Sequence, residues 1–153
     1  MLTLQTSITA RGWTLGALFM LMTLPALAEA RNVRIDAPAS TVAGRVIEVS
    51  FIANTEAGQG ERVGFLHAEF SSDGGKTWTP LCYLEDVGVE ITRVCTVKAG
   101  PAGTTLRLRV RVAFRGGLAG DVDYAGAAIR WKDTWENWSQ PPAMFAVIAV
   151  RKG

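Results

Sequence analysis

The sequence predicts an all-β fold, an antiparallel β-sandwich of about seven to eight strands, and three observations lead to this prediction. Short apolar or alternating runs recur along the 153 residues. Turns rich in glycine and polar residues separate these runs. No run repeats apolar residues with the period of an amphipathic helix over the length that a typical helix needs. A sandwich buries one face of each strand, so it accounts for all three observations.

The expected strands follow one another between recognisable turns. The turn around Ala43 and Gly44, the polar loop EAGQGER, the loop SSDGGK and the pair Gly88 and Val89 separate the first five segments. The segment after Thr104 is the clearest strand, because Leu, Leu, Val and Val alternate there with three arginines. In chain order, we expect strands at residues 31–38, 44–54, 63–72, 77–84, 90–99, 104–114, near 121–131 and at 143–151.

The first part of the chain is typical of a secretory signal peptide. Arg11 precedes the apolar run TLGALFMLMTL, and Pro25 and small residues follow it. Cleavage after Ala28 or after Ala30 satisfies the small-residue rule, and we favour Ala28. A retained membrane anchor is the weaker alternative, because the run is about a dozen residues long and a bilayer core requires about 20. We therefore expect a signal peptide at 1–28 and one sandwich domain at 29–153, in the periplasm or secreted, without membrane association after cleavage.

Charge and cysteine content exclude several classes of protein. Loss of the signal peptide removes Arg11 and leaves fifteen basic and fourteen acidic residues. A near-neutral protein is not an electrostatic binder of nucleic acid. In an oxidising compartment, Cys82 and Cys95 are expected to form a disulfide rather than a metal site or a redox centre. A hairpin turning about Gly88 and Val89 would place them opposite each other, and closing that loop stabilises by about 3 kcal/mol in the chain-entropy model.

The loop FSSDGGKTWTPL is expected to hold a hairpin together rather than to perform chemistry. Asp73 is followed by two glycines, which tolerate the positive φ of a short turn. The Asp73 carboxylate can accept hydrogen bonds from the backbone amides of the turn, and Trp78 can fold back over it as an apolar lid. The structural residues of this hairpin are Ser71, Asp73, Gly75, Thr77 and Trp78.

These residues carry a resemblance to known families. Their spacing matches the Asp-box pattern S-x-D-x-G-x-T-W, a structural hairpin of sialidases and other β-propellers, but this chain has one copy and is too short for a propeller. The stretch FLHAEFSSDGGKTWTPL is similar to the V-x-V-S-x-D-G-G-x-T-W segment in the immunoglobulin-like dimerisation domain of the sulfite oxidase family. LRLRVRVAF and SQPP occupy places similar to that domain's arginine-bearing strand and its Gln-Pro.

The resemblance covers about ninety residues, from Val63 to Pro142, and only its DGGKTW core is specific. It implies an immunoglobulin-like sandwich used for assembly. A homodimer is therefore one form that this assembly can take. It does not imply oxidase activity, because no molybdenum-cofactor domain precedes this region and neither cysteine lies in a segment like those that ligate the cofactor.

Two groups of residues are candidates for binding. Arg107, Arg109 and Arg111 share one face of a strand, either paired with acids on a neighbouring strand or forming a surface for an anion or an acidic partner. The segment IRWKDTWENWSQPP contains three further candidates, Trp131, Trp135 and Trp138. These tryptophans either cover one end of the sandwich, or anchor a protein partner, or stack on sugar rings.

The sequence offers few residues for catalysis. His67 is the only histidine, so a zinc site of histidine and cysteine cannot be assembled, and we interpret it as structural. No G-x-S-x-G nucleophile turn is present. Asp121 and Asp123 lack the acidic density of a calcium loop and are interpreted as an ordinary turn.

From these observations we expect an exported interaction or assembly module without enzyme activity, cofactor or metal, which binds a protein partner. The alternative is a carbohydrate-binding protein that uses Trp131, Trp135 and Trp138. A small hydrolase or a metal-dependent enzyme is a third, weaker class.

Overall fold

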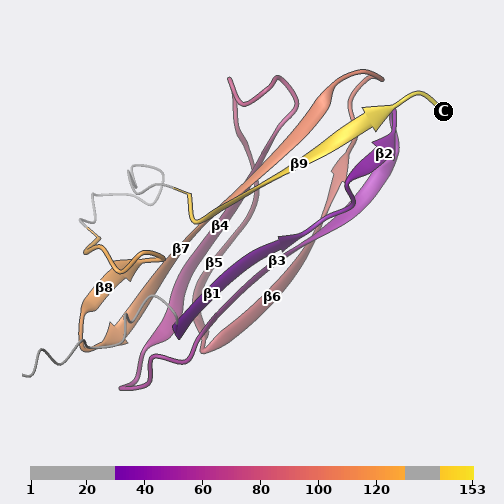
Figure 1. Ribbon diagram of the computed structural model, residues 1–153. Helices are drawn as coiled ribbons and strands as arrows, with labels where there is room; N and C mark the ends of the chain where they lie inside the picture. The colour runs from indigo at the N-terminus through magenta and orange to yellow at the C-terminus, as the bar shows by residue number, and fades with distance from the viewer. Residues whose placement is uncertain (1–29, 130–141) are drawn as a thin grey trace, which may run out of the picture.

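The computed structural model describes residues 30–129 and 142–153, and nearly all regular structure in them is β-strand. Figure 1 shows long strands packed as two layers. The prediction of an all-β sandwich is confirmed. The strands are β1 (Arg31–Asp36), β2 (Ser40–Val42), β3 (Val46–Thr55), β4 (Arg62–Ser71), β5 (Thr79–Gly88), β6 (Glu90–Lys98), β7 (Thr105–Gly117), β8 (Gly120–Asp123) and β9 (Met144–Arg151). In the described ranges no helix is long and apolar enough to cross a membrane.

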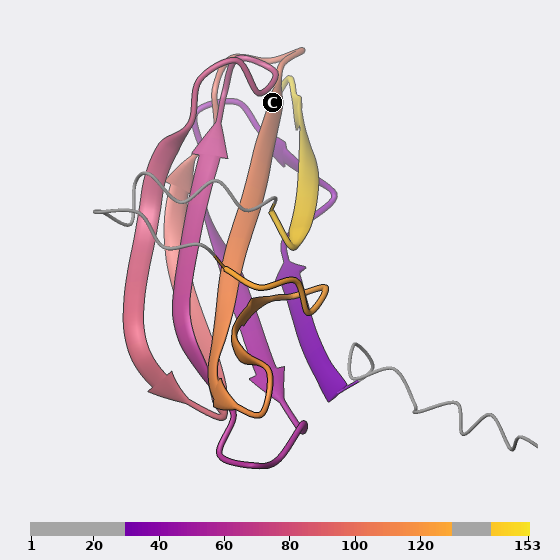
Figure 2. The ribbon, with the colours of Figure 1, turned by 90° about the vertical axis from the view of Figure 1, so that its left-hand side faces the viewer.

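The strands form two sheets in an immunoglobulin-like arrangement. One sheet has the order β1-β3-β6, and the other has the order β2-β9-β7-β4-β5 with β8 paired to β7. All neighbours are antiparallel except β2 and β9, which are parallel. Because the chain changes sheet between β1 and β2, the N-terminal segment supplies an edge strand to each layer. Figure 2 shows the two layers from the side.

Alternating residues of both sheets meet in one core. In β7, Leu106, Leu108 and Val110 are at most 1% exposed, and the arginines between them face away from the core. The same alternation in β3 and β4 buries Phe51 and Leu66 completely. Each such side chain contributes roughly 1.5–3 kcal/mol when it is removed from water. The clear alternation in the sequence therefore predicts both the strands and their inward face.

The connection between β5 and β6 corrects the predicted cysteine hairpin. β5 pairs with β4 and β6 pairs with β3, so the chain crosses from one sheet to the other near Gly88. Cys82 and Cys95 are therefore not cross-strand neighbours in one ladder. They face each other across the interior, near one open edge of the sandwich. A strand switch of this kind is invisible in a sequence, because two consecutive strands look alike whether they pair or separate.

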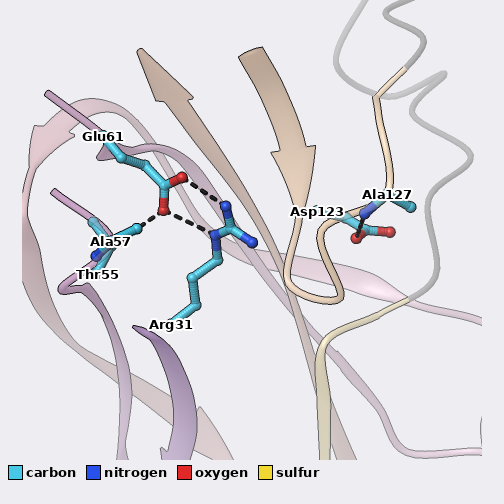
Figure 3. Close-up of polar contacts among 6 residues, drawn as sticks. All are labelled: Arg31, Thr55, Ala57, Glu61, Asp123 and Ala127. Atoms are coloured by element: carbon cyan, nitrogen blue, oxygen red, sulfur yellow. Dashed lines mark hydrogen bonds and ion pairs between the residues drawn. The ribbon is translucent and has the colours of Figure 1, made fainter. Parts of the chain in front are cut away.

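A buried ion pair lies at one end of the sandwich, beside the start of β1 (Figure 3). The Arg31 guanidinium donates from Nε to Oε1 of Glu61 at 2.8 Å and from Nη2 to Oε2 at 2.6 Å. The two side chains are 2% and 3% exposed. Thr55 Oγ1 donates to Oε1 of the same carboxylate at 2.6 Å. Burial alone would raise the pKa of Glu61, but its hydrogen bonds with Arg31 and Thr55 and the charge of Arg31 lower it overall.

Candidate interaction surface on the six-stranded sheet

The predicted arginine row lies on the outer face of the six-stranded sheet. In the strand register, Arg107 lies beside Ser71 of β4, Arg109 beside Glu69, and Arg111 beside His67. On the other side of β7, Arg107 lies beside Val147 of β9 and Arg109 beside Phe145. Because successive side chains alternate between the faces of a sheet, all these residues share the outer face. We call Glu69, Trp78, Arg107, Arg109, Arg111, Phe145 and Val147 the outer-face cluster.

Glu69 is the acidic centre of the cluster and binds two of the three arginines. Its Oε2 accepts from Arg109 Nε at 2.5 Å and from Arg111 Nη1 at 2.6 Å. Burial alone would raise the pKa of Glu69, but the hydrogen bond from Arg109 and the charges of His67 and Arg109 outweigh it, so that pKa is lowered. Glu69 is the one acid among the seven residues of the cluster, which contain three arginines. The cluster therefore keeps a net positive charge, to which the exposed Arg107 adds.

The hairpin between β4 and β5 is built by side chains that bind its own backbone. Ser71 Oγ donates to Asp73 Oδ1 at 2.7 Å and accepts from Gly75 N at 2.8 Å. Asp73 Oδ1 accepts from the amides of Lys76 and Thr77, both at 2.9 Å. Thr77 Oγ1 donates to Asp73 Oδ2 at 2.6 Å. These bonds, above all those from Thr77, hold the pKa of Asp73 far below its ordinary value.

Trp78 connects this hairpin to the sheet. Its Nε1 donates to the carbonyl of Gly75 at 3.1 Å, so the indole lies back against the turn. The Arg109 guanidinium carbon lies 4.0 Å from the centre of the Trp78 ring. The Phe145 ring centre lies 6.5 Å from that of Trp78. The indole is thus more than a lid on its own turn, because it also packs on β7 and β9.

Phe145 and Val147 extend the cluster as an exposed apolar row on β9. Phe145 is 59% exposed and Val147 is 56% exposed. The sequence does not show which face of this strand is buried, because AMFAVIAVR is apolar at almost every position. The signal in the sequence is the odd number of positions between these two residues and the buried Ile148 and Val150, which places the two pairs on opposite faces of the strand.

A second aromatic group lies on the same face near β5. Phe65 and Tyr83 have ring centres 6.3 Å apart, and the ring of His67 meets Tyr83 edge-on at 6.4 Å. The Arg115 guanidinium lies 5.3 Å from the Phe65 ring centre. Tyr83 Oη donates to Glu85, and burial together with this carboxylate raises the pKa of Tyr83. His67 therefore lies in an aromatic setting.

The remaining predicted site residues lie elsewhere. Asp121 accepts from Arg115 Nε at 3.0 Å, and the buried Asp123 accepts from the amide of Ala127 at 2.9 Å (Figure 3). Within the described residues, no group of three metal-binding side chains occurs. Trp131, Trp135 and Trp138 lie outside the described residues, and both readings of them as binding residues stay predictions.

Cys82 and Cys95 are present as two half-buried thiols that interact with each other. Burial raises the pKa of Cys82 to about 12, and the neighbouring Cys95 thiol adds to this shift. The predicted disulfide stays a prediction, now as a link between the two sheets.

Comparisons with known proteins show likeness in fold only. No protein-family model and no curated protein sequence matches this chain. A superoxide reductase (neelaredoxin) from Ignicoccus hospitalis is 15% identical over 65% of this chain and 81% of that chain, with a TM-score of 0.41. The sensor domain of the anti-sigma factor RsgI4 from Pseudobacteroides cellulosolvens is 14% identical over 67% of this chain and 97% of that chain, with a TM-score of 0.38.

These comparisons correct the expectation that the chain is not an enzyme. Superoxide reductases are enzymes and resemble it in fold, so a sandwich of this kind is no ground for excluding catalysis. The likeness assigns no activity to this chain.

Proposed function

We propose that this chain is an exported interaction or assembly module, located in the periplasm, that binds a protein partner through the outer-face cluster. The observation that supports this most directly is the exposure of Phe145 and Val147 beside the Trp78–Arg109 stack. Tryptophan and arginine dominate the binding energy of many protein interfaces, where apolar neighbours exclude water around them. A homodimer, which the resemblance to the sulfite oxidase dimerisation domain implies, is one form of such a partner.

The surface is also prepared for binding, because its polar groups are already held in place. Glu69 fixes the Arg109 and Arg111 guanidinium groups at 2.5 and 2.6 Å, and Trp78 is held by its bond to Gly75. A partner therefore has little side-chain entropy to remove on binding. The remaining positive charge favours a partner with acidic groups around an apolar centre.

The test is affinity capture from the exported fraction of the native host with tagged mature chain. The informative variant is Phe145→Asp/Val147→Asp, which places charge on two exposed positions and should leave the fold intact by circular dichroism. Val94→Asp is the matched control, because Val94 is 50% exposed on the other sheet. We expect a stoichiometric partner, or a second copy of the chain, to be retained by wild type and by Val94→Asp and lost from the double variant.

Two results would contradict this proposal. Undiminished capture by the folded double variant would exclude the outer-face cluster as the binding surface. A chain that captures no protein but binds a polysaccharide, with or without the double substitution, would instead favour the carbohydrate alternative.

A further inference from the structure

A hollow of about 600 Å³ opens at the edge of the sandwich where β1 leaves the three-stranded sheet and β2 joins the other sheet. It lies between β2, the start of β3 and the end of β9. Pro38, in the connection between β1 and β2, lines it. This hollow shares no residue with the outer-face cluster.

The start of β3 has a backbone edge that faces this hollow. β1 covers β3 only from Ser50 onward, whereas β6 pairs with β3 along its whole length from Val46. The carbonyl of Arg45 accepts from the amide of Ala99 on the β6 side. Because the backbone groups of an antiparallel strand alternate in direction, those of Val46 and Glu48 point to the β1 side. Among the described residues, no strand pairs with them there.

The walls of the hollow combine apolar and cationic side chains. Val46 is 59% exposed and Val42 is 38% exposed. Arg45, Arg151 and Lys152 also line it, and none of the three forms an ion pair with a described residue. Glu48 is the one acid among the lining residues, so the hollow carries a net positive charge.

We propose that this edge is a strand-addition site for an extended acidic peptide segment of a partner protein. The backbone N–H and C=O groups of Val46 and Glu48 pair with the peptide backbone, which is how extended peptides join an exposed sheet edge. Arg45, Arg151 and Lys152 bind carboxylates of the peptide, and Val42 and Val46 contact an apolar side chain. The edge from Val46 to Val49 is about 13 Å long, which suits a segment of about four residues.

The test measures fluorescence anisotropy of labelled peptides with the mature wild-type chain. One peptide alternates valine with aspartate, and a second alternates valine with lysine. Two further forms of the aspartate peptide carry N-methylated backbone amides, one form on one edge of the strand and one on the other. We expect saturable binding of the aspartate peptide that weakens as salt is raised. The lysine peptide and one of the two N-methylated forms should bind at least tenfold more weakly.

Variants separate the backbone contribution from the charge contribution. Val46→Pro removes the N–H that points into the hollow, at the first residue of a strand where proline is tolerated. It should weaken binding about tenfold, whereas Val46→Ala, which keeps the N–H, should stay within threefold of wild type. Arg45→Glu should weaken binding of the aspartate peptide about tenfold, whereas the control Lys76→Glu, on the β4–β5 hairpin and not among the lining residues, should not. Thermal unfolding checks that each variant is folded.

Three results would overturn this inference. They are the absence of saturable binding of the aspartate peptide, equal binding of the lysine peptide, and undiminished binding by Val46→Pro. Loss of capture by the Phe145→Asp/Val147→Asp variant, with peptide binding retained, would show that the two surfaces act separately.

Discussion

Removal of the Glu61 carboxylate should destabilise the domain far more than removal of an exposed carboxylate. Glu61→Gln keeps the shape of the side chain but leaves the Arg31 charge, 2% exposed, without a countercharge. Breaking a buried pair on one side costs about 3–5 kcal/mol. The matched control is Asp36→Asn, because the Arg34–Asp36 pair is 56% and 55% exposed. Pairs of that kind contribute about 0–1 kcal/mol.

The assay is equilibrium urea unfolding at pH 7 with thermal unfolding beside it. For a domain of about 120 residues, the expected loss corresponds to a decrease in Tm of roughly 10–20 °C for Glu61→Gln. Asp36→Asn should change Tm by only a few degrees. The double variant Arg31→Met/Glu61→Leu should recover part of the loss, because it removes the buried charge that the single variant leaves behind.

The pH dependence provides an independent test of the same pair. The folded state lowers the pKa of Glu61, so the stabilisation is complete above the pKa of the unfolded glutamate, about 4.3. It is lost as the pH falls through the lower folded-state value. The stability difference between wild type and Glu61→Gln should therefore shrink below about pH 4. A Glu61→Gln variant no less stable than Asp36→Asn, or a difference that persists at low pH, would show that the Arg31–Glu61 pair does not stabilise the fold in this way.

Three further predictions concern the cysteines, the hairpin and one glycine. Exported protein unfolded without reductant should contain no free thiol, and two thiols would exclude the Cys82–Cys95 disulfide. In reduced, native protein, Cys82 should alkylate slowly at pH 8, because its pKa of about 12 leaves little thiolate. Asp73→Asn should increase hydrogen exchange of the Thr77 amide. The pKa of Asp73 measured by NMR should lie well below that of an ordinary aspartate, and an ordinary pKa would contradict the hairpin geometry. Gly116→Ala should destabilise the domain more than Gly120→Ala, by about 1 kcal/mol or more in urea unfolding. Both glycines have positive φ, but only at Gly116 would a Cβ meet a backbone oxygen, at 2.9 Å. Equal losses of stability in the two variants would contradict this.

The sequence predicts local features of this fold better than the contacts between distant segments. Strand positions could be predicted because alternation is a local property, and the β7 face follows directly from it. The Arg31–Glu61 pair joins residues 30 positions apart, and no pattern in the sequence indicates that they meet. The contact between Trp78 and Arg109 is hidden for the same reason, since it depends on how the hairpin folds back over β7.

The sequence indicates only part of the candidate site, also for a physical reason. The arginines are recognisable because charges interrupt an apolar run. Phe145 and Val147 are not, because alternation shows which apolar residues of β9 share a face and not which of the two faces is buried. The change of sheet after β5 was likewise hidden, because the hydrophobic pattern specifies which face of a strand is buried and not which strand lies beside it.

The parallel pairing of β2 with β9 has a consequence for how this chain reaches its native state. Ser40 pairs with Ala149, so an early strand and the last strand of the chain lie side by side. During synthesis from the N-terminus, β2 cannot form this pairing until β9, about one hundred residues later, has been made. Pairings between such distant segments require closure of a very long loop, which slows folding of β-sandwiches to milliseconds or seconds. Truncation that removes β9 should therefore impair folding itself, because β2 then has no strand to pair with in its sheet.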